Sequence, residues 1–181
     1  MTPRGAEARR AGADDLVVGR FGARFGGRWF VASVGHGGIV PAETKREGDG
    51  ATPAGAWRLT RLYWRPDRLA RPHTVVSAVP LGPRTGWAED PCDPAYNSEI
   101  RHPHGFAADR MRRGDGLYDL CAATDHNAAR VPGAGSAIFL HVWRGPRRPT
   151  AGGVALARGD LAWILARWRP WSRRVVQLPA A

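Results

Sequence analysis

Glycine and proline limit the fold of this chain more than any other feature, because 23 Gly and 15 Pro interrupt its 181 residues. Neither residue suits the interior of a long helix, whereas strands joined by tight turns accommodate both. The breaks leave short runs that predict strands, at 16–24, 29–34, 56–64, 74–79, 116–123, 136–143 and 173–178. Apolar residues make up 43% of the chain, which is enough for one buried core. We therefore expect a mostly β domain.

Helical spacing is confined to two segments. The clearer helix begins at Gly159-Asp160, where either residue is able to cap it, and ends before Pro170. Its apolar residues share one face: Leu161, Ile164, Leu165 and Trp168. A shorter helix is predicted over 106–113. Segment 82–97 is expected to be a loop, and Gly26-Gly27 is expected to be a hairpin turn.

We expect residues 1–14 to form a flexible tail and residues 15–181 to form a single domain. The tail is polar and lacks the apolar core of a secretory signal, and no apolar run is long enough for a membrane span. The net charge is +11, yet no zinc-finger spacing, basic helix or RNA-binding motif accompanies it. We therefore interpret the charge as a solvated surface or as attraction to an anionic partner other than nucleic acid.

Segment 136–156 carries the residues best suited to chemistry. A predicted strand brings His141 to its end, and a loop rich in Gly, Pro and Arg follows. The chain then reads Thr150-Ala151-Gly152-Gly153-Val154. A histidine at the end of a strand is a candidate proton carrier, because its ring changes charge near neutral pH.

This segment resembles the signature of the L,D-transpeptidase catalytic domain of the YkuD type, in which a His is followed by Ser/Thr-x-Gly-Cys and an apolar residue. Four positions match that signature: His141, Thr150, Gly152 and Val154. Gly153 stands at the position of the nucleophilic cysteine. Other segments match the small proteobacterial branch of the family in the same order: Gly50-Ala51-Thr52-Pro53-Ala54-Gly55, Gly86-Trp87, Tyr96-Asn97, Leu117-Tyr118-Asp119 and 132–141.

The resemblance runs from Lys45 to about Trp168 and implies an L,D-transpeptidase-type β-sandwich with one or two short helices. Members of this family cut the bond before the terminal D-residue of a peptidoglycan stem peptide through a cysteine acyl-enzyme, and an amine on a second stem then takes the acyl group. A nearby His lowers the thiol pKa, and backbone amides stabilise the oxyanion. We expect no cofactor and no metal. Such a substrate implies the periplasm or the cell envelope.

The resemblance also implies roles for individual residues. The expected catalytic set is His141 as base, the amides of Gly152 and Gly153 as oxyanion donors, and Thr150 as the residue that shapes the loop. Many relatives bind the substrate carboxylate with an arginine where this chain has Ala155. The candidate substrate-binding residues are Arg144, Arg158, His126 and Trp87, with Arg147 and Arg148 as alternatives.

Two functions remain open. The first is a peptidoglycan enzyme, which needs a cysteine at position 153; the second is a non-catalytic relative that binds stem peptides or a partner enzyme. We expect neither Cys92 nor Cys121 to replace the nucleophile, because both lack a small-residue turn beside a histidine. A zinc site built on His102 and His104 with His126 and His141 is disfavoured, since no Asp or Glu that could act as the base lies at a suitable spacing. The oligomeric state is left open.

Overall fold

A computed structural model describes residues 11–20 and 22–179. The mostly β fold is confirmed, with one α-helix, α1 (Arg158–Ala166), and a 3₁₀ turn at Ala42–Thr44. The first large sheet has the order β3 (Arg28–Phe30), β2 (Gly22–Phe25), β1 (Leu16–Gly19), β16 (Arg174–Val176), β7 (Gly55–Trp57). The second has the order β4 (Ala32–Ser33), β15 (Val154–Leu156), β14 (Leu140–Val142), β13 (Leu120–Thr124), β8 (Leu59–Trp64), β9 (Ala78–Pro80).

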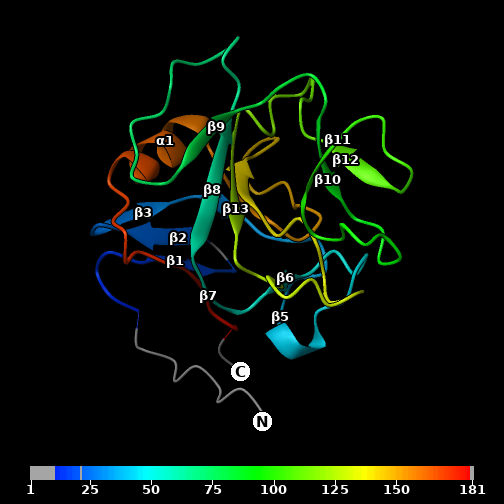
Figure 1. Ribbon diagram of the computed structural model, residues 1–181. Helices are drawn as coiled ribbons and strands as arrows, with labels where there is room; N and C mark the ends of the chain where they lie inside the picture. The colour runs from blue at the N-terminus through cyan, green and yellow to red at the C-terminus, as the bar shows by residue number, and fades with distance from the viewer. Residues whose placement is uncertain (1–10, 21, 180–181) are drawn as a thin grey trace.

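Two smaller sheets complete the described fold. One has the order β11 (Glu99–Arg101), β10 (Thr85–Ala88), β12 (Ala108–Arg110), and the other pairs β5 (Ile39–Val40) with β6 (Thr52–Pro53). Figure 1 shows β1–β3 on the left, β8 and β13 in the centre, and β10–β12 on the right. Within the described residues, no helix is long and apolar enough to cross a membrane.

Strand alternation divides the interior into two cores. Along β13, Leu120 and Ala122 face the first core, whereas Cys121 and Ala123 face the second. The first core lies between the two large sheets and takes in α1: Leu16, Val18, Phe25, Leu62, Leu140, Val154, Leu156, Leu161, Ile164 and Leu165 are among its members. The second lies on the other face of the six-stranded sheet and contains Tyr63, Leu81, Trp87, Met111 and Phe139. His141, which pairs with Cys121, faces this second core.

Several predictions about local structure are wrong in part or whole. Segment 16–24 contains the antiparallel strands β1 and β2 instead of one strand. Segment 106–113 is not helical, because β12 pairs with β10 and this tertiary pairing overrides the helical propensity of its residues. For the same reason segment 82–97 is not all loop, since it contains β10. Segment 56–64 is divided at Arg58 into two strands that belong to different sheets. There the Arg58 amide donates to Asp125 Oδ1 at 2.8 Å, at the corner between the sheets.

The predicted helix and hairpin are present. Helix α1 begins at Arg158, one residue earlier than expected, and no side chain caps it. Its predicted apolar face is buried as expected: Leu161, Ile164, Leu165 and, beyond the helix end, Trp168. Gly26 and Gly27 turn the chain between β2 and β3 with φ of +54° and +75°, the left-handed conformation that such turns need. The division into a tail and a single domain stays a prediction, and most of the tail lies outside the described residues.

Candidate active site

His141 lies in the middle of a row of side chains that crosses the six-stranded sheet on the face of the second core. The strand register places Cys121 beside His141 on one side and Ala155 on the other. Neighbours in such a row point to the same face of the sheet. Ala155, at which the resemblance led us to expect no carboxylate-binding arginine in this chain, is fully buried.

A hydrogen bond determines which ring nitrogen of His141 carries the proton. Nδ1 lies 2.9 Å from the Val142 carbonyl oxygen. Because a carbonyl only accepts, Nδ1 carries the hydrogen and Nε2 of the neutral ring is left as a proton acceptor. Burial, together with the positive charges of Arg113 and Arg174, lowers the pKa of His141 to about 4. The ring is therefore neutral at physiological pH and ready to accept a proton.

Gly153 lies against this ring. A side chain at position 153 would place its Cβ 3.0 Å from Nε2 of His141 and 2.8 Å from the carbonyl oxygen of Phe139. The backbone of Gly153 is outside the left-handed region, so its φ does not require glycine. Gly152 differs, because its φ is +141°. A residue at position 153 is thus directed at the histidine, which is the arrangement that a nucleophile and its base need.

Thr150 shapes the glycine loop. Its hydroxyl donates to the Gly153 carbonyl oxygen at 2.6 Å and accepts the Gly152 amide at 3.1 Å. The Gly152 amide is therefore engaged, whereas no acceptor contacts the Gly153 amide within the described part of the chain. Of the two amides predicted as oxyanion donors, only that of Gly153 is left to serve a bound group.

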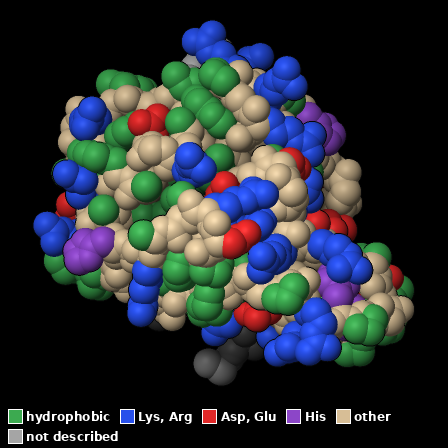
Figure 2. All heavy atoms as spheres, turned by 90° about the horizontal axis from the view of Figure 1, so that it is seen from above, with side chains coloured by type: hydrophobic (Ala, Val, Ile, Leu, Met, Phe, Trp, Pro, Cys, Tyr) green, Lys and Arg blue, Asp and Glu red, His purple; other side chains and the backbone are tan. Residues whose placement is uncertain are grey.

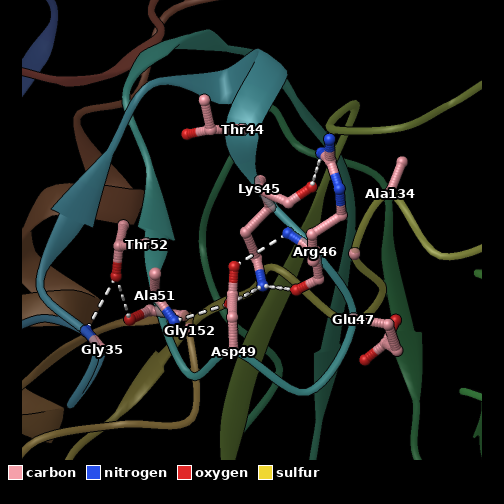
Figure 3. A network of polar contacts seen from close by, with 12 residues as sticks. Gly35, Thr44, Lys45, Arg46, Glu47, Asp49, Ala51, Thr52, Ala134 and Gly152 are labelled. Carbon is pink, nitrogen blue, oxygen red and sulfur yellow. Dashed lines mark hydrogen bonds and ion pairs between the residues drawn. The ribbon is translucent and has the colours of Figure 1, made fainter.

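The Gly-x-Thr-Pro-x-Gly segment, residues 50–55, packs against this loop. The Thr52 hydroxyl accepts the Gly35 amide at 2.8 Å and lies 3.5 Å from the Gly153 carbonyl oxygen (Figure 3). A Cβ at Gly152 would lie 3.1 Å from the Ala51 carbonyl oxygen. Close approach of the two backbones therefore requires glycine at position 152.

An ion pair orders the loop that precedes Thr52. Lys45, which is 2% exposed, donates to Asp49 and to the Arg46 carbonyl oxygen, the latter at 2.6 Å (Figure 3). Asp49 also accepts the amides of Arg46 and Ala51, each at 2.8 Å. Burial raises the pKa of Asp49, but Lys45 and these amides outweigh it and hold the pKa below its usual value. Glu47 is thereby fixed in the wall of the cleft.

The cleft in front of His141 and Gly153 has a volume of about 530 Å³. Six charged side chains line it: Glu47, Glu89, Asp109, Arg113, Arg144 and Arg148. Burial, and then the charges of Asp109 and Glu47, raise the pKa of Glu89 to about 7. One cavity therefore offers both carboxylates and guanidinium groups.

Tyr118 connects the acidic side of the cleft to the histidine. Its hydroxyl donates to Asp109 Oδ2 at 2.8 Å, and Arg113 lies 3.3 Å from the other oxygen of that carboxylate. The Tyr118 ring stands edge-on to the His141 ring, with centroids 5.6 Å apart. Burial raises the pKa of Tyr118 well above its usual value, so the hydroxyl stays protonated.

The candidate substrate-binding residues are divided between two places. Arg144 lines the cleft with His141, as does the alternative Arg148. Arg158 begins α1 and lies 3.5 Å from Asp119. His126 and Trp87 line a second hollow of about 370 Å³ that does not include His141. The sequence did not indicate Glu89, Asp109 or Arg113. The segments that resemble the family supply other residues of the cleft lining: Gly50, Leu117, Tyr118, Ser136 and Ala137.

His36 lines the cleft with Gly153, whereas neither cysteine, His104 nor His126 lines it. Cys92 is exposed. Cys121 is buried behind His141, and burial raises its pKa well above the usual value. His104 lies 2.5 Å from Asp93, and His126 Nε2 lies 3.1 Å from the Ala134 carbonyl oxygen. Among the described residues, no group of three potential ligands is arranged to hold a metal ion.

Comparison with known proteins assigns the chain. No curated protein and no solved structure matches it. The family model of the YkuD L,D-transpeptidase catalytic domain matches residues 18–176, which include both large sheets, the cleft and the glycine loop. The chain therefore belongs to the L,D-transpeptidase catalytic domain family.

Proposed function

We propose that the protein binds peptidoglycan stem peptides in the cleft and, with glycine at position 153, does not transfer their acyl groups. The carrying observation is the pairing of His141 with an empty side-chain position: a Cβ at 153 would lie 3.0 Å from Nε2, yet no thiol is present there. The base and one oxyanion donor of the family's reaction are kept, whereas the group that forms the acyl-enzyme is missing.

The charges of the cleft support a peptide ligand of this kind. A stem peptide carries free amines and free carboxylates, and the cleft offers partners for both. Arg144 and Arg148 lie in the loop between His141 and Thr150, so they are placed to bind a carboxylate near the glycine loop in the role that Ala155 no longer serves. Burial, and then the like charges of Asp109 and Glu47, raise the pKa of Glu89, and a bound ammonium group would relieve the repulsion between these carboxylates.

Calorimetric titration with a disaccharide-tetrapeptide tests the proposal. We expect binding to weaken about tenfold for Arg144→Gln or Arg148→Gln, and about a hundredfold when both are replaced, since each replacement removes a charged hydrogen bond. Arg147→Gln is the matched control, because Arg147 lies in the same loop but outside the cleft lining. Intact-mass measurement after incubation should show no covalent adduct. Equal affinity in all variants, or an acyl adduct on the native chain, contradicts the proposal.

A partner enzyme is the alternative ligand. Under that alternative the tetrapeptide does not bind, although the cleft is intact. A cysteine in the native gene at codon 153 would instead return the chain to the catalytic members of the family.

A further inference from the structure

Arg174 is a fully buried arginine, and it does not belong to the lining of the cleft. On β16 it alternates with the half-buried Val175 and shares the inner face with Val176, so its side chain points between the two large sheets. Over the face that Figure 2 shows, basic side chains lie at the surface with acidic ones among them. Arg174 instead places a cation in the interior, which is costly unless a carboxylate pairs with it.

No carboxylate neutralises this guanidinium group. Among the described residues, Arg174 takes part in no ion pair, and its Nε and Nη2 atoms have no hydrogen-bond partner. Burial lowers the pKa of Arg174 to about 9, although the charge of Asp125 acts in the opposite direction. The group therefore stays charged at neutral pH. Buried polar groups are rarely left unsatisfied, so this exception calls for a physical reason.

The hydrogen bond that Arg174 does make leads to the glycine loop. Nη1 donates to the Phe139 carbonyl oxygen at 3.1 Å, and the same oxygen accepts the Val154 amide at 2.8 Å. A Cβ at position 153 would lie 2.8 Å from that oxygen. The guanidinium group and the side-chain position of residue 153 therefore adjoin one carbonyl oxygen.

This arrangement determines the electrostatic field at position 153. A carbonyl oxygen with a free lone pair would repel a negative group there, but N–H donors occupy both lone pairs of the Phe139 oxygen. The guanidinium group adds a full positive charge, which acts strongly through buried protein of low dielectric constant. Gly153 leaves the position without a side chain, and in the described part of the chain its amide has no acceptor. Position 153 thus offers a hydrogen-bond donor in a positive field.

We propose that Arg174 is a positioning residue that makes position 153 a binding site for a carboxylate group. The carboxylate accepts the Gly153 amide in the space that a side chain would occupy, and Arg174 acts on it through the Phe139 carbonyl group without contact. The inference deepens the proposed function, on which it rests, because it assigns the chemical group of the ligand that reaches the glycine loop.

Other roles for this arginine and other groups at position 153 fit less well. An ammonium group has only donors, so it would oppose the Gly153 amide, and Arg174 would repel it. A hydroxyl group accepts from an amide but gains little from a neighbouring charge. If Arg174 served only to join the two sheets, a neutral donor would do so without the cost of a buried charge.

Acetate is the smallest probe of this site. The NMR resonance of the Gly153 amide is followed as acetate is added at constant ionic strength. We expect the native chain to bind acetate, Arg174→Met to bind it about tenfold more weakly, and Arg174→Lys, which keeps the cation, to recover most of the affinity. Arg24→Met is the matched control, because it removes an exposed charge from the same sheet, and it should bind as the native chain does. Methionine replaces a buried charge by an apolar chain, so we expect the melting temperature not to fall.

The ring of His141 gives a second readout, which a purely structural role for Arg174 would not move. Loss of the Arg174 charge should raise the pKa of His141 by about one unit in Arg174→Met and leave it unchanged in Arg174→Lys and Arg24→Met. All other groups that face the ring or line the cleft with it stay the same in these variants: Arg113, Asp115, Tyr118, Cys121, His36, Glu47, Glu89, Asp109, Arg144 and Arg148.

Several outcomes overturn the inference. They are absence of acetate binding to the native chain, equal affinity in Arg174→Met, and a loss of affinity that Arg174→Lys does not recover. A large fall in melting temperature for Arg174→Met with an unchanged pKa of His141 would make Arg174 a structural tie, which also overturns it. The tetrapeptide separates the inference from the proposed function: if acetate binds as expected while no form binds the tetrapeptide, the proposed function fails and the carboxylate site stands.

Discussion

Replacing Gly153 by cysteine places a thiol at a position that faces His141. The new Cβ would lie 3.0 Å from Nε2 of His141, which is neutral and has its lone pair free. The backbone at 153 is outside the left-handed region, so a side chain adds no conformational strain there. The steric problem is the Phe139 carbonyl oxygen at 2.8 Å, which is held by the Val154 amide and by Arg174.

The expected cost in stability is much smaller than the catalytic barrier that the thiol would lower. Shifting the glycine loop by a few tenths of an ångström costs about 1–3 kcal/mol of stability. Loss of a nucleophile from an intact catalytic unit costs on the order of 10⁶ in turnover, or about 8 kcal/mol of barrier. We therefore expect Gly153→Cys to be slightly less stable than the native chain and far more active. The gain is bounded by that factor.

The assay is release of D-alanine from a tetrapeptide stem, in a Cys92→Ser background. Gly153→Ala is the matched control, because it introduces the same Cβ without the thiol. It should lose the same stability and stay inactive. Equal turnover in the glycine, alanine and cysteine forms would refute the reasoning. Inactivity of all three, with the tetrapeptide still bound, would show that more than the nucleophile has been lost from the cleft.

Three further outcomes are expected. A carbapenem should form no stoichiometric adduct with Cys92 or Cys121, as intact mass will report, whereas a general alkylating agent should reach exposed Cys92 alone. Thr150→Val should lower the free energy of unfolding in urea by about 1–3 kcal/mol, because two buried backbone partners lose their bond, while Thr150→Ser should not. Burial lowers the pKa values of His126 and His141 in the folded chain to about 4, below the ordinary value of 6.5, so protons favour the unfolded chain. Stability should fall as pH drops from 6.5 toward 4, on the order of 3 kcal/mol per histidine, and His126→Gln should flatten that slope in pH-dependent urea titrations.

The sequence sufficed for the features that depend on nearby residues. His141 and Gly153 lie in one short segment, and β14 pairs directly with β15, which follows Gly153. The signature could therefore predict their contact from residues that are close in sequence. The hairpin at Gly26-Gly27 and the apolar face of α1 are equally local. Alternation along strands also placed Cys121 in the interior.

Features that depend on distant pairing were not predictable in the same way. Asp109 reaches the cleft because β12 pairs with β10, and residues 106–113 by themselves favour a helix. His126 and Trp87 were expected beside His141 because their segments adjoin it in sequence or in the family pattern. Trp87 on β10 and His126 after β13 instead line the second hollow. Which hollow a strand faces depends on the strands that pair with it, and a single sequence does not show that pairing.

Lys45 gives the molecule an unusual chemical property. It is the only lysine among 27 basic residues, and it is 2% exposed. Apart from the amino terminus, the folded chain therefore presents no primary amine to solvent. Amine-reactive reagents should label the folded protein once at most. A second label should appear only when the loop beside the cleft opens, so the rate of that second labelling measures the rate of opening. A protein of a family whose reaction consumes amines thus offers almost none of its own as an acceptor.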